Sequence, residues 1–211
     1  MKIKAKFTFT EELLGTKSAN PDIFAAWQAS KHPSGKPQAD ELALAKSTKE
    51  AADDEGDSEK EEVGGLTVFH RENGVPVIWD FQLKGLMKDS AGAINRFDKE
   101  FRDGMEKLSA YKTRIDGCIF VSPRIIPVQI PAGKDTTICE RPIRVEGPKG
   151  VRVAIARSEA APIGSTIEFE VEILESALHR WVQLWFNYGT KRGLGAWRNS
   201  GKGRFTWAEV E

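Results

Sequence analysis

The chain has 211 residues, of which 40% are hydrophobic and 29% are charged, so it is long enough to bury one sizeable core. No apolar run approaches the eighteen residues of a membrane helix, and the charged start Met1–Lys6 is unlike a signal peptide, so we expect no membrane span. The two cysteines, Cys118 and Cys139, are too few for a disulfide framework and too far apart for a zinc site. We therefore expect a cytoplasmic protein without a metal or other cofactor.

The formal net charge of zero conceals an uneven distribution of charge along the chain. Lys49–Glu62 contains eight acidic and two basic residues, whereas Lys191–Arg204 contains five basic residues and no acidic one. A block of one charge sign decides local binding more than the total does. A polyanionic partner is therefore compatible with the C-terminal part of the chain.

The first predicted elements are a strand and a short helix. Lys2–Phe9 alternates between polar and apolar residues, which is typical of a strand with one buried face. Asn20-Pro21-Asp22 supplies a helix cap, a first-turn proline and an acid, and predicts a short helix through Trp27. The polar stretch 34–64 cannot bury enough apolar surface to offset its ordering entropy, so we expect a mobile acidic insertion there.

A hairpin and a long helix are predicted next. Asn73-Gly74 supplies the positive φ angles of a tight turn between strands at 66–69 and 75–79. Apolar residues then recur at steps of three, four or seven, which indicates one helix with a single apolar stripe. That stripe contains Leu83, Leu86, Met87, Ile94, Phe97, Phe101, Met105 and Leu108. A strand over Ile115–Val121 follows, and the prolines and glycines of 122–163 predict an irregular β insertion.

The last elements are again regular. Apolar residues alternate with mostly acidic ones over 166–173, which predicts a strand. A helix ending at Tyr188-Gly189 and a strand over 204–210 follow; the apolar stripe of that helix is Leu174, Leu178, Trp181, Val182 and Trp185. Without the insertions, the order is the βαββαβ order of an α+β, ferredoxin-like (RRM-like) core with an antiparallel sheet. We expect a single domain over residues 1–211.

The predicted loop between the last helix and the last strand has the composition of a phosphate-binding loop. Residues 189–205 contain five glycines, five cations and Trp197, whose ring offers a face for base stacking. A flexible surface turn is the alternative. A nucleotide-binding P-loop is not expected, because Gly203 stands where Ser or Thr would hold magnesium and the loop leads from a helix into a strand.

Two motifs resemble the RAMP superfamily of RNA-binding subunits of CRISPR antiviral defence. In that superfamily a Leu-Lys-Gly segment opens a long helix, and a loop with two Gly-x-Gly segments precedes the last strand. Leu83-Lys84-Gly85 and the loop from Gly193 to Gly203 occupy these places, and Pro162–Thr166 is similar to the turn before the penultimate strand. In contrast, Asp80-Phe81-Gln82 stands where the family has small residues.

The resemblance implies a non-catalytic backbone-type subunit that grips guide or target RNA, beside other CRISPR-type subunits or copies of itself. The expected RNA contacts are Lys84, Gly85, Lys88, Lys191, Arg192, Gly193, Gly195, Trp197, Arg198, Gly201, Lys202, Gly203 and Arg204.

Two other functions remain open. The acidic insertion is unusual in an RNA-gripping subunit, which leaves room for a phage protein that imitates or blocks a CRISPR complex. RAMP endoribonucleases use a histidine without a metal, and His70, expected at a hairpin tip, is better placed than His32 or His179. Asp22 stands roughly where RNA-cutting backbone subunits have an aspartate and a divalent metal, but its place after Asn20-Pro21 is fully explained by helix capping.

Overall fold

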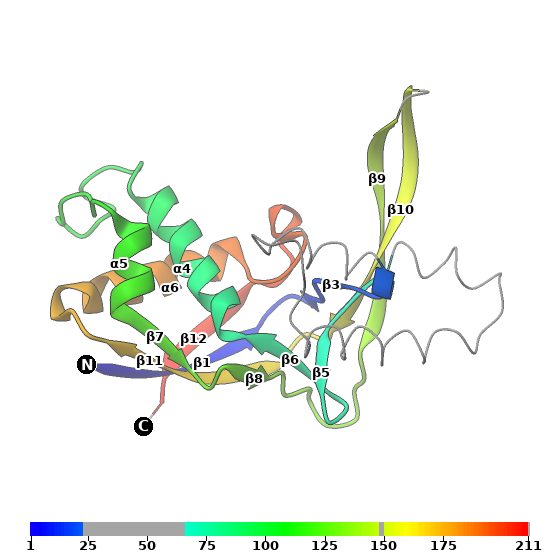
Figure 1. The fold of residues 1–211 in the computed structure, drawn as a ribbon, viewed down its shortest axis with the longest axis horizontal. Coiled ribbons are helices and arrows are strands. Elements are labelled where there is room, and N and C mark those ends of the chain that lie inside the picture. The colour runs from blue at the N-terminus through cyan, green and yellow to red at the C-terminus, as the bar shows by residue number, and fades with distance from the viewer. Residues whose placement is uncertain (23–65, 148–149, 211) are drawn as a thin grey trace. The chain divides into compact units, whose positions relative to one another are not determined.

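The computed structural model describes residues 1–22, 66–147 and 150–210 (Figure 1). Two compact units are present: unit 1 comprises Met1–Leu14, Phe69–Thr137 and Ala161–Glu211, and unit 2 comprises Gly15–Val68 and Ile138–Ala160. The acidic stretch 34–64, the predicted helix beyond Asp22 and His32 lie outside the described residues. None of the described helices is long and apolar enough to cross a membrane.

The main sheet of unit 1 has four antiparallel strands in the order β12-β1-β11-β7. These strands are β1 (Lys2–Phe9), β7 (Ile119–Ser122), β11 (Thr166–Ile173) and β12 (Phe205–Glu209). The alternation predicted for β1 and β11 is confirmed, because every second residue of each strand is buried. Ala5 of β1 lies opposite Phe169 of β11 and Glu209 of β12, which fixes the register of the sheet.

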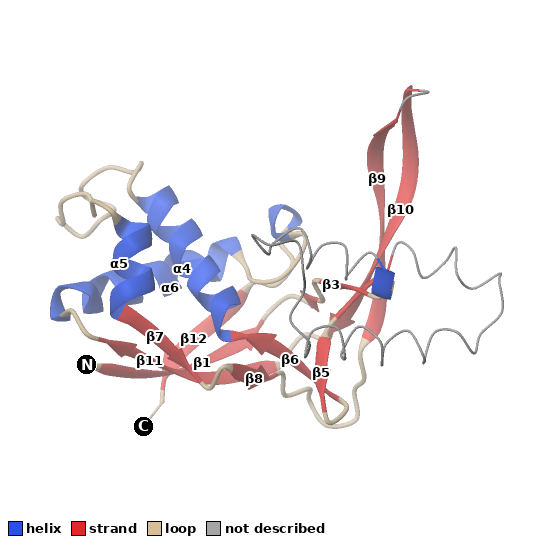
Figure 2. Cartoon of the chain, viewed as in Figure 1, coloured by secondary structure: helices blue, strands red, loops and turns tan. Residues whose placement is uncertain are grey.

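The helices of unit 1 lie on one face of this sheet (Figure 2). They are α4 (Asp80–Ile94), α5 (Tyr111–Cys118) and α6 (His179–Arg192), with the short 3₁₀ helix η1 (Ser176–Leu178) before α6. Along the chain, the strands of the main sheet and the three α-helices follow one another in the order β1, α4, α5, β7, β11, α6, β12. The fold class is α+β, as predicted.

The prediction of one long helix was wrong beyond Ile94, where α4 ends. The Asn95 side chain donates to the carbonyl of Leu108 (2.9 Å) and accepts from its N–H (3.1 Å), so it turns the chain back. Buried Arg102 donates to the Met105 carbonyl and holds the intervening turns. These turns leave Phe101 of the predicted stripe 50% exposed.

Two further boundaries differ from the sequence expectation. The strand predicted from Ile115 begins at Ile119, because buried Ile115 belongs to α5. Helix α6 continues past Gly189 to Arg192, and Leu174 lies outside it and is exposed. A Cβ on Gly189 would lie 3.1 Å from Phe205 and 3.3 Å from Leu86, so this glycine allows α6 to pack closely on α4 and β12.

A second, three-stranded sheet of unit 1 has the order β5-β6-β8. Its strands are β5 (His70–Glu72), β6 (Val75–Trp79) and β8 (Ile125–Pro127). The predicted turn is confirmed, because Asn73 and Gly74 have φ angles of 50° and 80°. The first strand of this hairpin was predicted over 66–69, but it is β5, which begins at His70. His70 therefore pairs with Val77 within the sheet and does not lie at the hairpin tip.

Unit 2 contains β3 (Lys17–Ser18), β4 (Leu66–Val68), β9 (Thr137–Gly147) and β10 (Gly150–Ala161). Strand β4 pairs antiparallel with β3 and parallel with β10, and β9 pairs with β10. The Thr67 hydroxyl donates to that of Ser158 (2.8 Å) and joins β4 to β10. The region predicted as an irregular β insertion therefore contains the two longest described strands.

The core of unit 1 centres on Phe7, which is fully buried. Its ring stacks on Phe205 of β12 at a centroid distance of 4.0 Å and an interplanar angle of 10°. The rings of Phe169 (β11) and Phe186 (α6) meet it edge-on at 4.9 Å and 5.1 Å. One side chain thus joins three strands and a helix.

We expect Phe7→Ala to lower the free energy of unfolding by about 3 to 5 kcal/mol, because it leaves a cavity among three rings. The measurement is urea denaturation followed by circular dichroism. Leu174→Ala, which truncates a residue that is 64% exposed, is the control and should change stability by less than about 0.5 kcal/mol. Equal losses in the two variants would contradict this account of the core.

Candidate nucleic-acid interface

The glycine loop, defined as Gly193–Arg204, joins α6 to β12 and contains the 3₁₀ helix η2 (Arg198–Ser200). Its two Gly-x-Gly segments lie against each other, because the N–H of Leu194 donates to the carbonyl of Gly203 (2.9 Å). The N–H of Gly203 in turn donates to the carbonyl of Glu12 (2.8 Å). Leu194 is buried in the core, so the loop is closed at its base and anchored to unit 1.

Three glycines of this loop allow backbone segments to approach each other closely. A Cβ on Gly203 would lie 1.8 Å from the Leu194 carbonyl oxygen, and one on Gly193 would lie 2.5 Å from that of Lys202. A Cβ on Gly195 would lie 2.8 Å from the carbonyl oxygen of Leu14. All three glycines have positive φ angles, which other residues rarely adopt. These glycines shape the loop, and their predicted contacts with RNA stay predictions.

Replacing Gly203 by alanine should disrupt the loop more than replacing Gly201. Both glycines have positive φ angles, 69° and 87°, so both variants carry the same kind of backbone strain of about 1 kcal/mol. Only the Gly203→Ala methyl group meets backbone, whereas that of Gly201→Ala meets the movable Arg204 side chain at 3.4 Å.

Thermal unfolding should therefore show a larger loss of stability for Gly203→Ala than for Gly201→Ala, by about 2 kcal/mol or more. The same ranking is expected in hydrogen exchange of the Leu194 amide. Indistinguishable variants would show that the loop is not closed by this contact.

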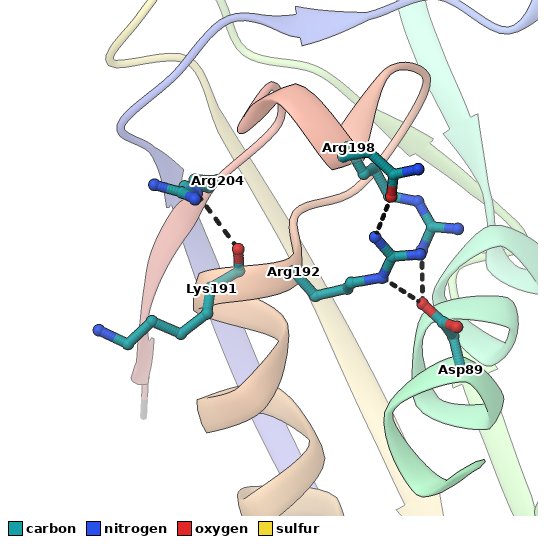
Figure 3. Close-up of polar contacts among 6 residues, drawn as sticks. Asp89, Lys191, Arg192, Arg198 and Arg204 are labelled. Carbon is teal, nitrogen blue, oxygen red and sulfur yellow. Dashed lines mark hydrogen bonds and ion pairs between the residues drawn. The ribbon is translucent and has the colours of Figure 1, made fainter. Parts of the chain in front are cut away.

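Three of the five cations of this region are paired with carboxylates. Asp89 of α4 accepts hydrogen bonds from Arg192 Nε (2.8 Å) and Arg198 Nη1 (3.0 Å), as Figure 3 shows. Lys202 Nζ lies 2.6 Å from Glu12 Oε2. These pairs fasten the loop to α4 and to the segment after β1.

The other two cations, Lys191 and Arg204, are exposed. Arg204 Nε donates to the carbonyl oxygen of Lys191 (3.2 Å), which holds the guanidinium beside the end of α6 (Figure 3). Within the described part of the chain, neither side chain has a carboxylate partner. Two carboxylates thus neutralise only part of five positive charges. Lys191 and Arg204 carry two of the three charges that remain, and the third belongs to the two arginines that share Asp89.

The structure divides the predicted RNA contacts between the two flanks of α4. Lys84 Nζ lies 5.0 Å from the centroid of the Phe120 ring of β7, and Lys88 Nζ lies 2.6 Å from Asp116 Oδ1 of α5. Asp89 instead faces the glycine loop. Gly85 is exposed on α4. The two lysines therefore lie on the same helix as Asp89, but they contact β7 and α5, whereas Asp89 binds Arg192 and Arg198.

Trp197 is half-buried and precedes η2 with a φ angle of 55°. The left-handed region is unfavourable for such a bulky side chain, so the contacts around it must compensate.

The candidate catalytic residues are spread over separate elements. The His70 ring meets Trp79 edge-on at 5.7 Å, and half-buried His179 begins α6. The N–H of Asp22 donates to Asn20 Oδ1 (2.9 Å), as the capping interpretation requires. In the described ranges, no cluster of three His, Cys, Asp or Glu residues has the arrangement of a metal site.

The face of the main sheet opposite the helices carries matched charges. Lys2 and Lys6 of β1 form ion pairs with Glu170 (2.7 Å) and Glu168 (2.8 Å) of β11. The hydrogen bond from Lys2 to Glu170, together with the charge of that carboxylate, raises the pKa of the lysine. The sequence shows both charged faces but not that they are neighbours. This face therefore offers little attraction to a polyanion.

No family model and no curated protein matches the chain. Among solved structures, it is similar to a chain of the Type III-B Cmr-beta complex bound to cognate target RNA, with a TM-score of 0.48 and 10% identity. That match covers all of this chain and 60% of the other.

Two further structures give similar values. A chain of a Type IV-B CRISPR complex has a TM-score of 0.49 and 9% identity, and Cmr6 from Pyrococcus furiosus has 0.48 and 13%. Both matches cover all of this chain, and they cover 90% and 98% of the other chains. At such values, the comparisons do not assign the chain to a family.

Proposed function

We propose that the chain is a non-catalytic RNA-binding protein of the RAMP type, which holds the phosphates of guide or target RNA with its glycine loop. The strand order of the main sheet supports a ferredoxin-like core. Counted along the chain without the additions, β12-β1-β11-β7 is the order fourth, first, third, second, and α4 and α6 follow the first and third strands.

The positions of the two sequence motifs support the same proposal. Leu83-Lys84-Gly85 lies in the first turns of α4, and the paired Gly-x-Gly segments form the loop before β12. Asp89, one turn beyond Gly85, binds the arginines of the loop, so the two motif regions are joined by ion pairs.

The observation on which the proposal depends most is the exposure of Lys191, in the last turn of α6, and of Arg204, at the end of the closed glycine loop. The hydrogen bond from Arg204 to the Lys191 carbonyl holds the guanidinium beside the last turn of α6, the turn that carries Lys191. Phosphates are bound mainly by such cations, with release of counterions. The loop does not have to be ordered on binding, because its backbone and its ion pairs already fix it.

Binding to RNA should depend on salt through these two residues. In single-stranded RNA, each phosphate contact contributes roughly 0.7 to the slope of log K against log salt. We expect the double variant Lys191→Ala, Arg204→Ala to lose about 1.4 of that slope. The measurement is fluorescence anisotropy of labelled single-stranded RNA over a salt series.

The matched control is Lys2→Ala, Lys6→Ala, which removes the same formal charge from the sheet face, where both lysines are paired with glutamates. It should leave the slope nearly unchanged. Salt-independent binding, or equal losses in the two double variants, would sink the proposal. Binding to a purified CRISPR complex without any binding to RNA would favour the phage-protein alternative instead.

The absence of catalysis is part of the proposal. His70 is a strand residue whose ring packs edge-on against Trp79, and this structural role accounts for its position. We expect labelled RNA to stay intact with the wild-type protein, with and without a divalent metal. Cleavage that is lost in His70→Ala would establish the endoribonuclease alternative.

A further inference from the structure

Aromatic side chains gather around Trp79 at the start of α4. We call Trp79, Phe81 and His70, together with Arg124, which lies over the Trp79 ring, the aromatic platform. Phe81 is 57% exposed although it is a large apolar residue. Its ring lies nearly parallel to that of Trp79, with an interplanar angle of 17° and a centroid distance of 6.1 Å. Arg124 lies over the Trp79 ring at 5.8 Å, and His70 meets that ring edge-on.

The backbone holds these residues in place. Strands β6 and β8 pair so that Trp79 lies opposite Ile125, which brings Arg124 beside the indole. The N–H of Asp80 donates to the Arg124 carbonyl (3.0 Å). The N–H of Trp79 donates to Gln82 Oε1 (2.8 Å), which caps the first turn of α4. The rings are thus displayed from a rigid junction of strand and helix.

Phe81 also belongs to the segment that departs from the RAMP pattern. Asp80-Phe81-Gln82 stands where small residues are expected, and burial does not explain the phenyl ring because most of it is in contact with solvent. A ring exposed beside a second, nearly parallel ring offers a flat face to a planar ligand.

We propose that the aromatic platform stacks a base of single-stranded RNA, with Phe81 as the main contact. This inference rests on the proposed function and extends it to a second contact site. Stacking on aromatic rings is a general means of holding unpaired bases, and a neighbouring arginine adds a cation for the phosphate.

The charges around the platform favour a polyanion. Arg124 lies over the Trp79 ring, and Lys84 lies over the Phe120 ring. Arg71 is exposed on β5. The acids of β5 and α4 are Glu72, Asp80 and Asp89, of which Asp89 binds Arg192 and Arg198.

The platform and the glycine loop are within reach of one RNA strand. Phe81 precedes Asp89, which binds the loop, by eight residues, or roughly 12 Å along the helix axis. A strand whose phosphates lie at Lys191 and Arg204 therefore has a base-stacking surface at the start of α4, the helix whose Asp89 binds the arginines beside them.

The test uses the full chain and single-stranded RNA of mixed sequence that carries 2-aminopurine, whose fluorescence is quenched on stacking. Phe81→Ala and Phe81→Leu should weaken binding roughly tenfold and reduce the quenching, whereas Phe81→Tyr should retain both. Phe101→Ala, which removes a phenyl ring that is 50% exposed, is the control and should have no effect. None of these variants should change the salt slope, since no cation is removed.

The inference is overturned if Phe81→Leu binds and quenches like the wild type, or if Phe101→Ala weakens binding as much as Phe81→Ala. In the first case, a salt slope that still depends on Lys191 and Arg204 leaves the proposed function standing. A wild-type protein that does not bind RNA at all overturns both proposals. Circular dichroism of each variant shows that a loss of binding is not a loss of folding.

Discussion

The approach of two backbone segments within the glycine loop is the constraint on which the candidate site depends. At Gly203 the space next to the Leu194 carbonyl is too small for any Cβ, and at Gly193 a Cβ would meet the Lys202 carbonyl, so the two segments can meet only with glycine at these two positions. Their contact fixes the end of α6 relative to the start of β12. Phe205, the first residue of β12, stacks on Phe7 in the core. The loop is therefore an extension of the core, and its cations occupy defined positions.

Ion pairing then determines which of the loop cations are available to a ligand. The pairs at Asp89 and Glu12 are partly exposed, so each stabilises the fold by only about 0 to 1 kcal/mol. Their main effect is geometric, because they hold three long side chains along the loop. Lys191 and Arg204 have no such partner in the described residues, and their charge is the part that a phosphate can neutralise at no cost to the fold.

Much of the fold could be predicted from local patterns, and the errors have a common cause. The alternation in β1 and β11 and the turn at Asn73-Gly74 depend on neighbouring residues alone. The apolar residues recur at helical spacing as far as Leu108, so the sequence pattern does not reveal the end of α4. That end is set by the hydrogen bonds of Asn95 to Leu108, 13 positions away. In the site, the cations were visible, but Asp89 lies 103 and 109 positions from Arg192 and Arg198. Such pairings are set by the tertiary fold.

The distribution of charge over the main sheet explains why α4, and not the open sheet face, connects the proposed contacts. On that face the lysines of β1 meet the glutamates of β11 in register, so the attraction for phosphate is cancelled where a flat surface would otherwise be available. On the helical side, α4 bears aromatic rings at its start and Asp89 farther along, and Asp89 positions the arginines of the loop. The proposed stacking surface and the proposed phosphate contacts are therefore linked by one helix, which carries the rings at its start and holds the loop through Asp89.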